Sequence, residues 1–194
     1  MAHSTLHLLR HGETEGGPRY RGSSDDALTP LGWQQMETAV GDTTWDRIIT
    51  SPLIRCADFA RALAERRSIP LTIDPRLREM HFGAWEGKSA AELMESDADA
   101  LARFWRDPAA NPPPGGEPLA DFQARMLGAW REIIQNHPGQ RLLLVSHGGP
   151  IRAILCEVQG HPLTRMLEIE VGHGALRCVR VGDGFPELRE DDIP

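Results

Sequence analysis

The residues LLRHGET at positions 8–14 place an arginine and a histidine together at the end of an apolar run. The apolar run predicts a buried strand, and the glycine after His11 permits a sharp turn of the backbone. A neutral imidazole can attack phosphorus while the guanidinium of Arg10 holds the phosphoryl oxygens. The pair therefore predicts phosphoryl transfer, although a buried strand that ends in a polar turn is the alternative.

Two further polar segments each follow a predicted buried strand. Residues 51–55 follow a β-branched run at 48–50, and residues 146–148 follow four apolar residues at 142–145. In an open α/β sheet, ligands bind beyond the carboxyl ends of the strands. We therefore expect both segments to share one crevice with His11.

Arg55, His147 and Gly148 are the candidate phosphate ligands in these segments. Arg55 falls in the first turn of a predicted helix, from which its side chain can reach back over the sheet. Gly148 lies just before another predicted helix, whose unpaired amide groups and dipole favour phosphate. With Arg10, these groups would neutralise a phosphoryl group during its transfer. The alternatives are a solvent-exposed arginine and a strand-end histidine bonded to backbone.

The length and composition of the chain limit the class of protein to which it can belong. The chain has 194 residues and a formal net charge of −7, which predicts one globular domain over residues 1–194 and argues against nucleic-acid and membrane partners. No membrane span or secretory leader is predicted, so we expect a cytoplasmic protein; its oligomeric state is not predicted. Cys56, Cys156 and Cys178 lack metal or redox spacing and are expected to be buried.

Strands and helices alternate along the chain. Thr29 and Pro30 predict a capped helix through Val40, and Ser51–Pro52 predict a second start of the same kind. A third helix is expected from Pro150 to Val158. Strands are predicted at 6–9, 48–50, 71–73, 142–145, 168–171 and 176–181. This alternation predicts a three-layer α/β/α fold with a mostly parallel central sheet.

The middle of the chain departs from this alternation. Residues 88–137 are helical in pattern, but the segment PAANPPPGGEP at 108–118 excludes both helix and strand. We interpret residues 88–137 as a helical insertion that could close over the site as a lid. The last residues, EDDIP at 190–194, are expected to be a solvated tail.

Four motifs occur in an order that resembles the histidine phosphatase superfamily, in its phosphoglycerate-mutase-like branch. They are RHGET at 10–14, SPLIRC at 51–56, LREMHFGAWEG at 77–87 and VSHGG at 145–149. The resemblance covers nearly the whole chain. It implies that His11 is the nucleophile, that Arg10, Arg55 and His147 hold the phosphate, and that neither a metal nor another cofactor is needed.

The resemblance also implies a proton donor and one missing ligand. Glu79 falls where the family places the acid that protonates the leaving oxygen and later activates water; otherwise it would be expected to pair with Arg76 or Arg78. Many relatives carry asparagine six residues after the nucleophile, where this chain has Gly17. Backbone amides, Arg19 or Arg21 are the candidate replacements.

Residues 10–36, the HFGAWEG motif and PPPGGE at 112–117 are similar to α-ribazole phosphatases, although Pro118 stands where serine is usual. This similarity implies removal of the 5′-phosphate from α-ribazole 5′-phosphate, or its cobamide-linked form, in cobalamin assembly. A benzimidazole base would suit an apolar wall. The candidates for that wall are Phe82, Trp85 and Trp105, each of which could instead be core.

Other functions remain open on the sequence. A broad small-molecule phosphatase would use the same residues. A mutase would need extra cations over the site, where residues 87–107 offer only Lys88, Arg103 and Arg106. A metal-dependent hydrolase would use His11, Glu79, His81 and His147, without a recognised ligand spacing. A non-catalytic module that binds phosphorylated ligands is the last alternative.

Overall fold

The carboxyl ends of four parallel strands meet along one edge of the central sheet. The computed structural model describes residues 3–182 and 186–189. Within them the sheet has six strands in the order β3-β2-β4-β1-β5-β6. The strands from β3 to β1 are parallel, whereas β5 and β6 are antiparallel additions. They are β1 (Ser4–Arg10), β2 (Arg47–Thr50), β3 (Leu71–Ile73), β4 (Arg141–Ser146), β5 (Leu176–Val181) and β6 (Glu187–Arg189).

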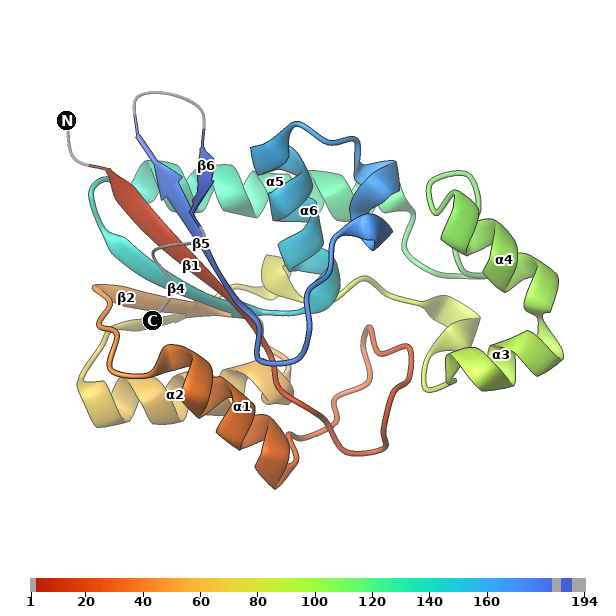
Figure 1. Ribbon diagram of the computed structural model, residues 1–194, viewed down its shortest axis with the longest axis horizontal. Helices are drawn as coiled ribbons and strands as arrows, with labels where there is room; N and C mark the ends of the chain where they lie inside the picture. The colour runs from red at the N-terminus through yellow and green to blue at the C-terminus, as the bar shows by residue number, and fades with distance from the viewer. Residues whose placement is uncertain (1–2, 183–185, 190–194) are drawn as a thin grey trace.

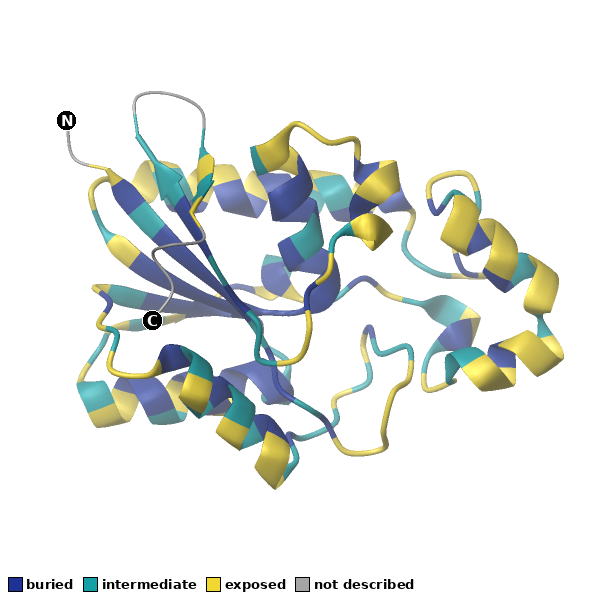
Figure 2. Ribbon diagram, in the orientation of Figure 1, coloured by how far each residue is buried: buried dark blue, intermediate teal, exposed yellow. Residues whose placement is uncertain are grey.

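Helices cover both faces of this sheet (Figure 1). The helices α1 (Pro30–Val40) and α2 (Ile54–Arg67) lie on one face, and α5 (Leu119–Asn136) and α6 (Gly148–Gln159) on the other. Alternate residues of β4 divide between two apolar clusters, so that Leu143 packs toward α1 and α2 and Leu144 toward α5 and α6. Figure 2 shows the strands buried between the two layers. The predicted three-layer fold with a mostly parallel sheet is confirmed.

The predicted helical insertion extends beyond the sheet edge (Figure 1). It begins with α3 (Ala90–Ser96) and α4 (Ala98–Arg106), whose residues Leu101 and Phe104 are buried in the same apolar cluster as the α5–α6 face. The proline-rich segment 108–118 is tied to the chain around η2 (Gly83–Trp85). The N–H of Ala84 donates to the carbonyl of Pro114 at 2.8 Å, which anchors this segment beside the site.

The Thr29 cap is confirmed, but the second predicted cap is wrong. The Thr29 hydroxyl accepts a hydrogen bond from the N–H of Gly32, and Pro30 is the first helical residue of α1. By contrast α2 begins at Ile54, with Leu53 at the cap position and no side-chain cap bond. The hydroxyl of Ser51 lies 2.7 Å from Nε2 of His147. Ser51 therefore bonds to His147 and does not cap α2.

The predicted strand at 168–171 is also wrong. The 3-10 helix η3 (Leu163–Glu168) ends there, and the following residues run without ladder pairing. Their carbonyl groups are used differently: Ile169 accepts from Arg152 at 2.8 Å, and Val171 accepts from Arg10 at 2.6 Å. Arginine side chains therefore occupy the acceptors that a neighbouring strand would need. The predicted start of α6 at Pro150 is two residues late.

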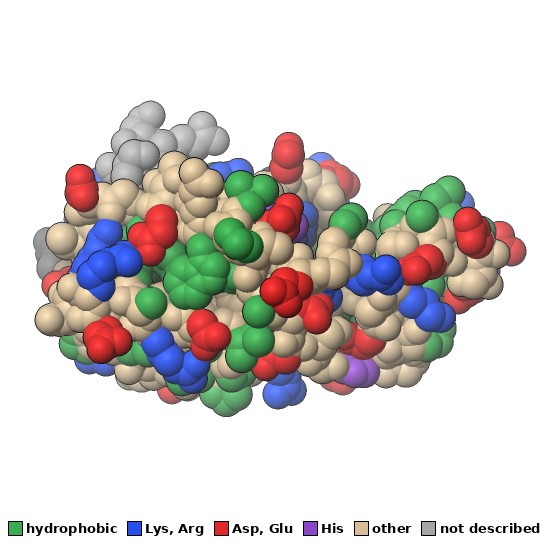
Figure 3. Space-filling view, turned by 90° about the horizontal axis from the view of Figure 1, so that it is seen from below, with side chains coloured by type: hydrophobic (Ala, Val, Ile, Leu, Met, Phe, Trp, Pro, Cys, Tyr) green, Lys and Arg blue, Asp and Glu red, His purple; other side chains and the backbone are tan. Residues whose placement is uncertain are grey.

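The remaining predictions concern the surface and the cysteines. All three cysteines are buried and free, as predicted. Among the described residues, no helix is long and apolar enough to cross a bilayer. The face in Figure 3 intersperses cationic, anionic and apolar side chains. The strand β6 and the 3-10 helix η1 (Pro75–Leu77) were not predicted, and the predicted tail at 190–194 lies outside the described residues.

Candidate active site

His11 is fixed by backbone contacts on both sides. It follows β1 directly, its N–H donates to the carbonyl of Ser146 at 3.0 Å, and its own carbonyl accepts from Gly174 at 3.2 Å. The turn at Gly12 lies against the start of α1, where a Cβ atom on Gly12 would come within 2.0 Å of the Gly32 carbonyl oxygen. Only glycine permits this approach, so the backbone holds the His11 ring in one place.

The His11 ring is prepared as a neutral imidazole with a free lone pair. Its Nδ1 lies 2.8 Å from the carbonyl oxygen of Gly12, and since a carbonyl can only accept, Nδ1 carries the proton. Burial, together with the positive charge of Arg55, holds the pKa of His11 well below the ordinary 6.5. The ring is therefore uncharged at neutral pH, and Nε2 is unprotonated.

Arg55 and His147 form a buried pair behind His11. The Nε–H of Arg55 donates to Nδ1 of His147 at 3.1 Å, so the Nε2–H of His147 donates to Ser51. The His11 and His147 rings meet edge to face at 5.3 Å between centroids. Burial and the Arg55 charge keep the pKa of His147 well below 6.5, so this ring is also neutral. Ends of β1, β2 and β4 thus meet as the sequence predicted.

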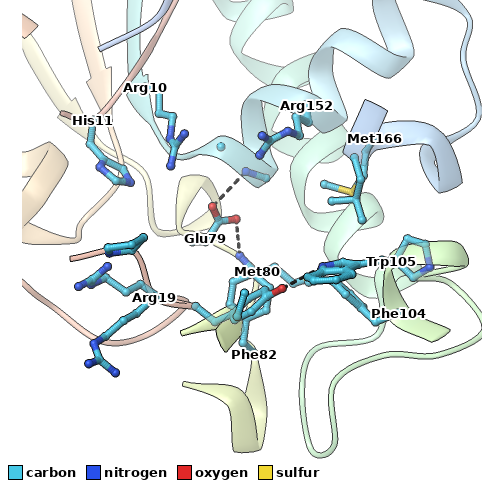
Figure 4. A pocket seen from close by; sticks show the side chains of 18 of the residues that line it. Arg10, His11, Arg19, Glu79, Met80, Phe82, Phe104, Trp105, Arg152 and Met166 are labelled. Atoms are coloured by element: carbon cyan, nitrogen blue, oxygen red, sulfur yellow. Dashed lines mark hydrogen bonds between the residues drawn. The ribbon is translucent and has the colours of Figure 1, made fainter. Parts of the chain in front are cut away.

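Two more arginines converge on the first turn of α6. In Figure 4, Arg10 and Arg152 point toward the helix start from opposite sides. A Cβ on Gly148 would come within 2.7 Å of the Arg152 guanidinium, so this glycine makes room for Arg152, whereas Arg10 Nε at 3.5 Å would be in ordinary contact. Over the described ranges, neither these arginines nor Arg55 forms an ion pair with a carboxylate. No direct ion pair therefore cancels the positive charge of this cluster.

Glu79 lies against the same helix start. Its carboxylate accepts from the N–H of Gly149 at 3.0 Å and from that of Met80 at 2.9 Å (Figure 4). A Cβ on Gly149 would fall 2.1 Å from the Glu79 carboxylate, so the second glycine is also required. Arg76 pairs instead with Asp74 and Glu132. The alternative pairing predicted for Glu79 with Arg76 is therefore not formed.

Apolar side chains form a wall of the same cavity, next to these polar groups. Phe82, Phe104, Trp105 and Met166 line a cavity of about 350 Å³ together with His11, Glu79, Arg10 and Arg152, whereas Arg55 and His147 are fully buried beneath it. The indole N–H of Trp105 donates to the Tyr20 hydroxyl at 3.0 Å and so joins α4 to the loop after β1. Phe82 and Trp105 lie where an apolar wall was predicted. Trp85 does not line the cavity, because it is only 1% exposed and packs in the core.

The candidate replacements for the missing asparagine line the cavity but have other partners. Arg19 donates to Glu92 at 2.9 Å, and Arg21 donates to Asp26 and to the carbonyl of Gly17. Each charge is therefore balanced nearby. A cation for the substrate must come from elsewhere in the site.

Sequence reasoning missed two cavity residues, Arg152 and His173. Arg152 lies one helical turn after Gly148, a spacing that could have indicated it. His173 stacks near His11, with 5.6 Å between ring centroids, and belongs to an irregular loop without a sequence signal. Within the part of the chain that the structure describes, no three His, Cys, Asp or Glu residues cluster as a metal site.

A neutral histidine surrounded by arginines, at the carboxyl edge of an α/β sheet, is typical of enzymes that transfer phosphoryl groups. The model of the histidine phosphatase superfamily, branch 1, matches residues 6–192. This chain belongs to that family.

Curated relatives carry several substrate names. A bifunctional protein of Mycobacterium tuberculosis is 36% identical over 77% of this chain, and the match spans only 43% of that relative's length. The adenosylcobalamin/α-ribazole phosphatase of Salmonella typhimurium is 30% identical, over 95% of this chain and 94% of that protein. A glucosyl-3-phosphoglycerate phosphatase of Mycolicibacterium vanbaalenii is 35% identical, over 81% and 75%.

Solved structures share the whole fold. Bacillus stearothermophilus YhfR superposes with a TM-score of 0.88 at 31% identity, covering 98% of both chains. A putative α-ribazole-5′-P phosphatase from Escherichia coli gives 0.84 at 28% identity, covering 96% of this chain and 94% of that one. The similarity therefore includes residues 88–137.

Proposed function

We propose that this chain hydrolyses small phosphate monoesters through a phosphohistidine at His11. The observation that carries the proposal is the set of three arginines without carboxylate partners around a neutral, lone-pair-bearing histidine. Nε2 of His11 attacks phosphorus, the P–N bond forms, and the ester P–O bond breaks as the leaving oxygen takes a proton from Glu79. The arginines and the α6 amides balance the charge on the phosphoryl oxygens.

The second half of the reaction uses the same groups in reverse. The Glu79 carboxylate takes a proton from a water molecule, the water oxygen bonds to phosphorus, and the P–N bond breaks. Inorganic phosphate leaves, and His11 and Glu79 return to their starting states. Glu79 already holds two backbone N–H groups, which keeps its oxygens at the cavity floor between the two steps.

A labelling experiment tests this chemistry. Wild type and H11N are mixed with a ³²P-labelled ester in buffer with chelator, quenched, and assayed for acid-labile, base-stable phosphate on protein. Wild type should be labelled and H11N should not, with kcat/KM at least about 10⁴-fold lower in H11N. Labelling of H11N would refute the nucleophile. Activity that disappears in chelator and returns with a divalent ion would favour metal-dependent hydrolysis.

The wall of the cavity supports a finer proposal, an ester whose leaving group carries a flat, apolar base, as in α-ribazole 5′-phosphate. Phe82, Trp105 and Met166 offer apolar surface to a benzimidazole base. A glycosylated phosphoglycerate would expose hydroxyl groups and a carboxylate to the same wall. Arg19 and Arg21, the cations near the rim, already have acidic partners. These features favour the ribazole ester over the phosphoglycerate.

A comparison of kcat/KM decides the substrate. α-Ribazole 5′-phosphate, glucosyl-3-phosphoglycerate, 3-phosphoglycerate and p-nitrophenyl phosphate are measured side by side. A preference of about 100-fold for the ribazole ester, equal to about 2.7 kcal/mol of transition-state stabilisation, would support this proposal. Equal modest rates would indicate a broad phosphatase. Phosphoglycerate interconversion without phosphate release would indicate a mutase.

A further inference from the structure

Arg55 is fully buried, yet its charge faces neutral backbone groups. Besides His147, its guanidinium donates to the carbonyl oxygens of Ser24 at 2.6 Å, Arg21 at 3.2 Å and Gly22 at 3.3 Å. These three carbonyls come from the loop after β1. A buried cation without an opposite charge is unfavourable, so the loop must itself be stabilised.

The carboxylate of Glu86 binds the same loop from the other side. Glu86 follows η2 and accepts from the N–H of Gly22 at 3.0 Å, of Ser23 at 3.2 Å and of Ser24 at 3.3 Å. The Ser24 hydroxyl adds a bond at 2.9 Å. Burial raises the pKa of Glu86, but the hydrogen bond from the N–H of Phe82, together with these bonds, outweighs it and holds the pKa below its ordinary value, so the group is ionised at neutral pH.

Glu86 and Arg55 act on the same two peptide units. In the peptide that joins Arg21 to Gly22, the carbonyl accepts from Arg55 and the N–H donates to Glu86; the next peptide repeats this between Gly22 and Ser23. Each peptide dipole therefore lies between a cation and an anion, and both charges strengthen its hydrogen bonds. Glu86 is in effect the counter-ion of Arg55, transmitted through two peptide groups.

Local sequence and a second contact support this arrangement. A Cβ on Gly22 would lie 2.2 Å from the Met80 carbonyl oxygen and 2.3 Å from the Glu86 carboxylate, so glycine is required where the two peptides meet. Glu86 also accepts from the N–H of Phe82 at 2.9 Å, in the segment that carries Glu79. One carboxylate thus holds the loop beneath Arg55 and the segment that positions Glu79.

We propose that Glu86 is a positioning residue for phosphoryl transfer, which sets the place and charge balance of Arg55 without touching substrate. This inference rests on the proposed function, because Arg55 is taken as a phosphate ligand. Orthovanadate is the binding probe, since it needs no turnover. Its dissociation constant and the kcat/KM of p-nitrophenyl phosphate are compared in wild type, E86Q and E86D.

E86Q should weaken vanadate binding and lower kcat/KM, each by about 10- to 100-fold, the range over which the outer hydrogen-bond partners of metal ligands act at metal sites. E86D keeps the charge and should recover part of both losses. The control is D74N. Asp74 also accepts a backbone N–H and an arginine and has a lowered pKa, but its side chain lies outside the cavity. D74N should lower Tm while both site readouts stay within about twofold.

A double-mutant cycle with R55K separates positioning from general destabilisation. If Glu86 acts through Arg55, E86Q should have little further effect on vanadate binding in the R55K background. The inference would be overturned if E86Q, like D74N, changed vanadate binding and kcat/KM by no more than about twofold. It would also be overturned if E86Q weakened vanadate binding as much in the R55K background as in wild type. A wild type that binds vanadate but hydrolyses no ester would instead overturn the proposed function, and the vanadate comparison would still decide the role of Glu86.

Discussion

The state of the two facing histidines decides what this site can do. His11 carries its proton on Nδ1 because a carbonyl lies there, and His147 carries its proton on Nε2 because Arg55 donates to the other nitrogen. Neither ring has a carboxylate that would favour the charged form. Burial and the arginine charge therefore act in the same direction on both rings, and both pKa values fall.

Activity should accordingly persist at mildly acidic pH. Protonated His11 has no lone pair for attack, so kcat/KM falls only as pH drops through the lowered pKa of His11. We expect no loss of kcat/KM as pH is lowered to about 6.5, measured with p-nitrophenyl phosphate and corrected for titration of the ester. An acid limb centred at or above pH 6.5 would agree with this expectation if it disappeared when the substrate was changed, because it would then belong to the ester. An acid limb that persisted with every ester would contradict the expectation.

Protonation of the same two histidines should also make the free energy of unfolding depend on pH. The unfolded chain binds protons on these histidines near pH 6.5, whereas the folded chain does not, so stability is complete above that pH and falls below it. Each histidine contributes up to about 1.4 kcal/mol per pH unit, and each kcal/mol changes Tm by about 2–4 °C. Asp74 and Glu86 have lowered pKa values and stay ionised in this window.

The measurement is Tm between about pH 7.5 and 5.5 for wild type, H147Q and H161Q. H147Q should reduce the loss of Tm on acidification, whereas H161Q, at an exposed position, should leave it unchanged. Equal acid slopes in wild type and H147Q would show that His147 is not the group responsible.

Individual elements were predicted where local sequence decides them. The cap of α1 and the buried strand β4 follow from capping chemistry and apolar runs, and both were found. Residues 168–171 include β-branched residues of the kind found in strands, but arginines from other elements donate hydrogen bonds to the carbonyl groups of this segment. The Ser51 hydroxyl likewise bonds to the His147 ring instead of capping α2. Both errors come from long-range side-chain contacts, which no local pattern encodes.

The start of α6 gives a prediction at the scale of an element. In G149A the new methyl group would displace the Glu79 carboxylate, which a Cβ would approach to 2.1 Å. Since small displacements of catalytic groups cost about 100-fold, kcat should fall by that order. The matched control is G128A in α5, where a Cβ meets no atom within 4 Å.

G128A should leave kcat unchanged and stabilise the protein by about 1 kcal/mol, because alanine is the better helix former. Both variants are compared by kcat and by urea denaturation. Normal turnover in G149A would mean that Glu79 tolerates displacement and is not the proton donor.

At the scale of the molecule, the insertion and the sheet share one apolar cluster. Leu101 and Phe104 of α4 belong to the same buried cluster as Leu8 and Leu144 of the sheet. We therefore propose that the chain unfolds as one unit. Calorimetry should give one transition whose calorimetric and van't Hoff enthalpies agree. An earlier separate transition, absent when residues 88–118 are deleted, would identify this part of the insertion as an independent unit and favour its motion as a lid.

The bridge between Tyr20 and Trp105 has a consequence for spectroscopy. Tyr20 is the only tyrosine in the chain, and its ring lies 5.1 Å from that of Phe82 between centroids, at the cavity wall. Protein grown on 3-fluorotyrosine would therefore contain fluorine at one residue only. A ¹⁹F spectrum recorded during ligand addition would follow the rim of the cavity by itself, through two ring currents and one indole hydrogen bond, without any introduced label.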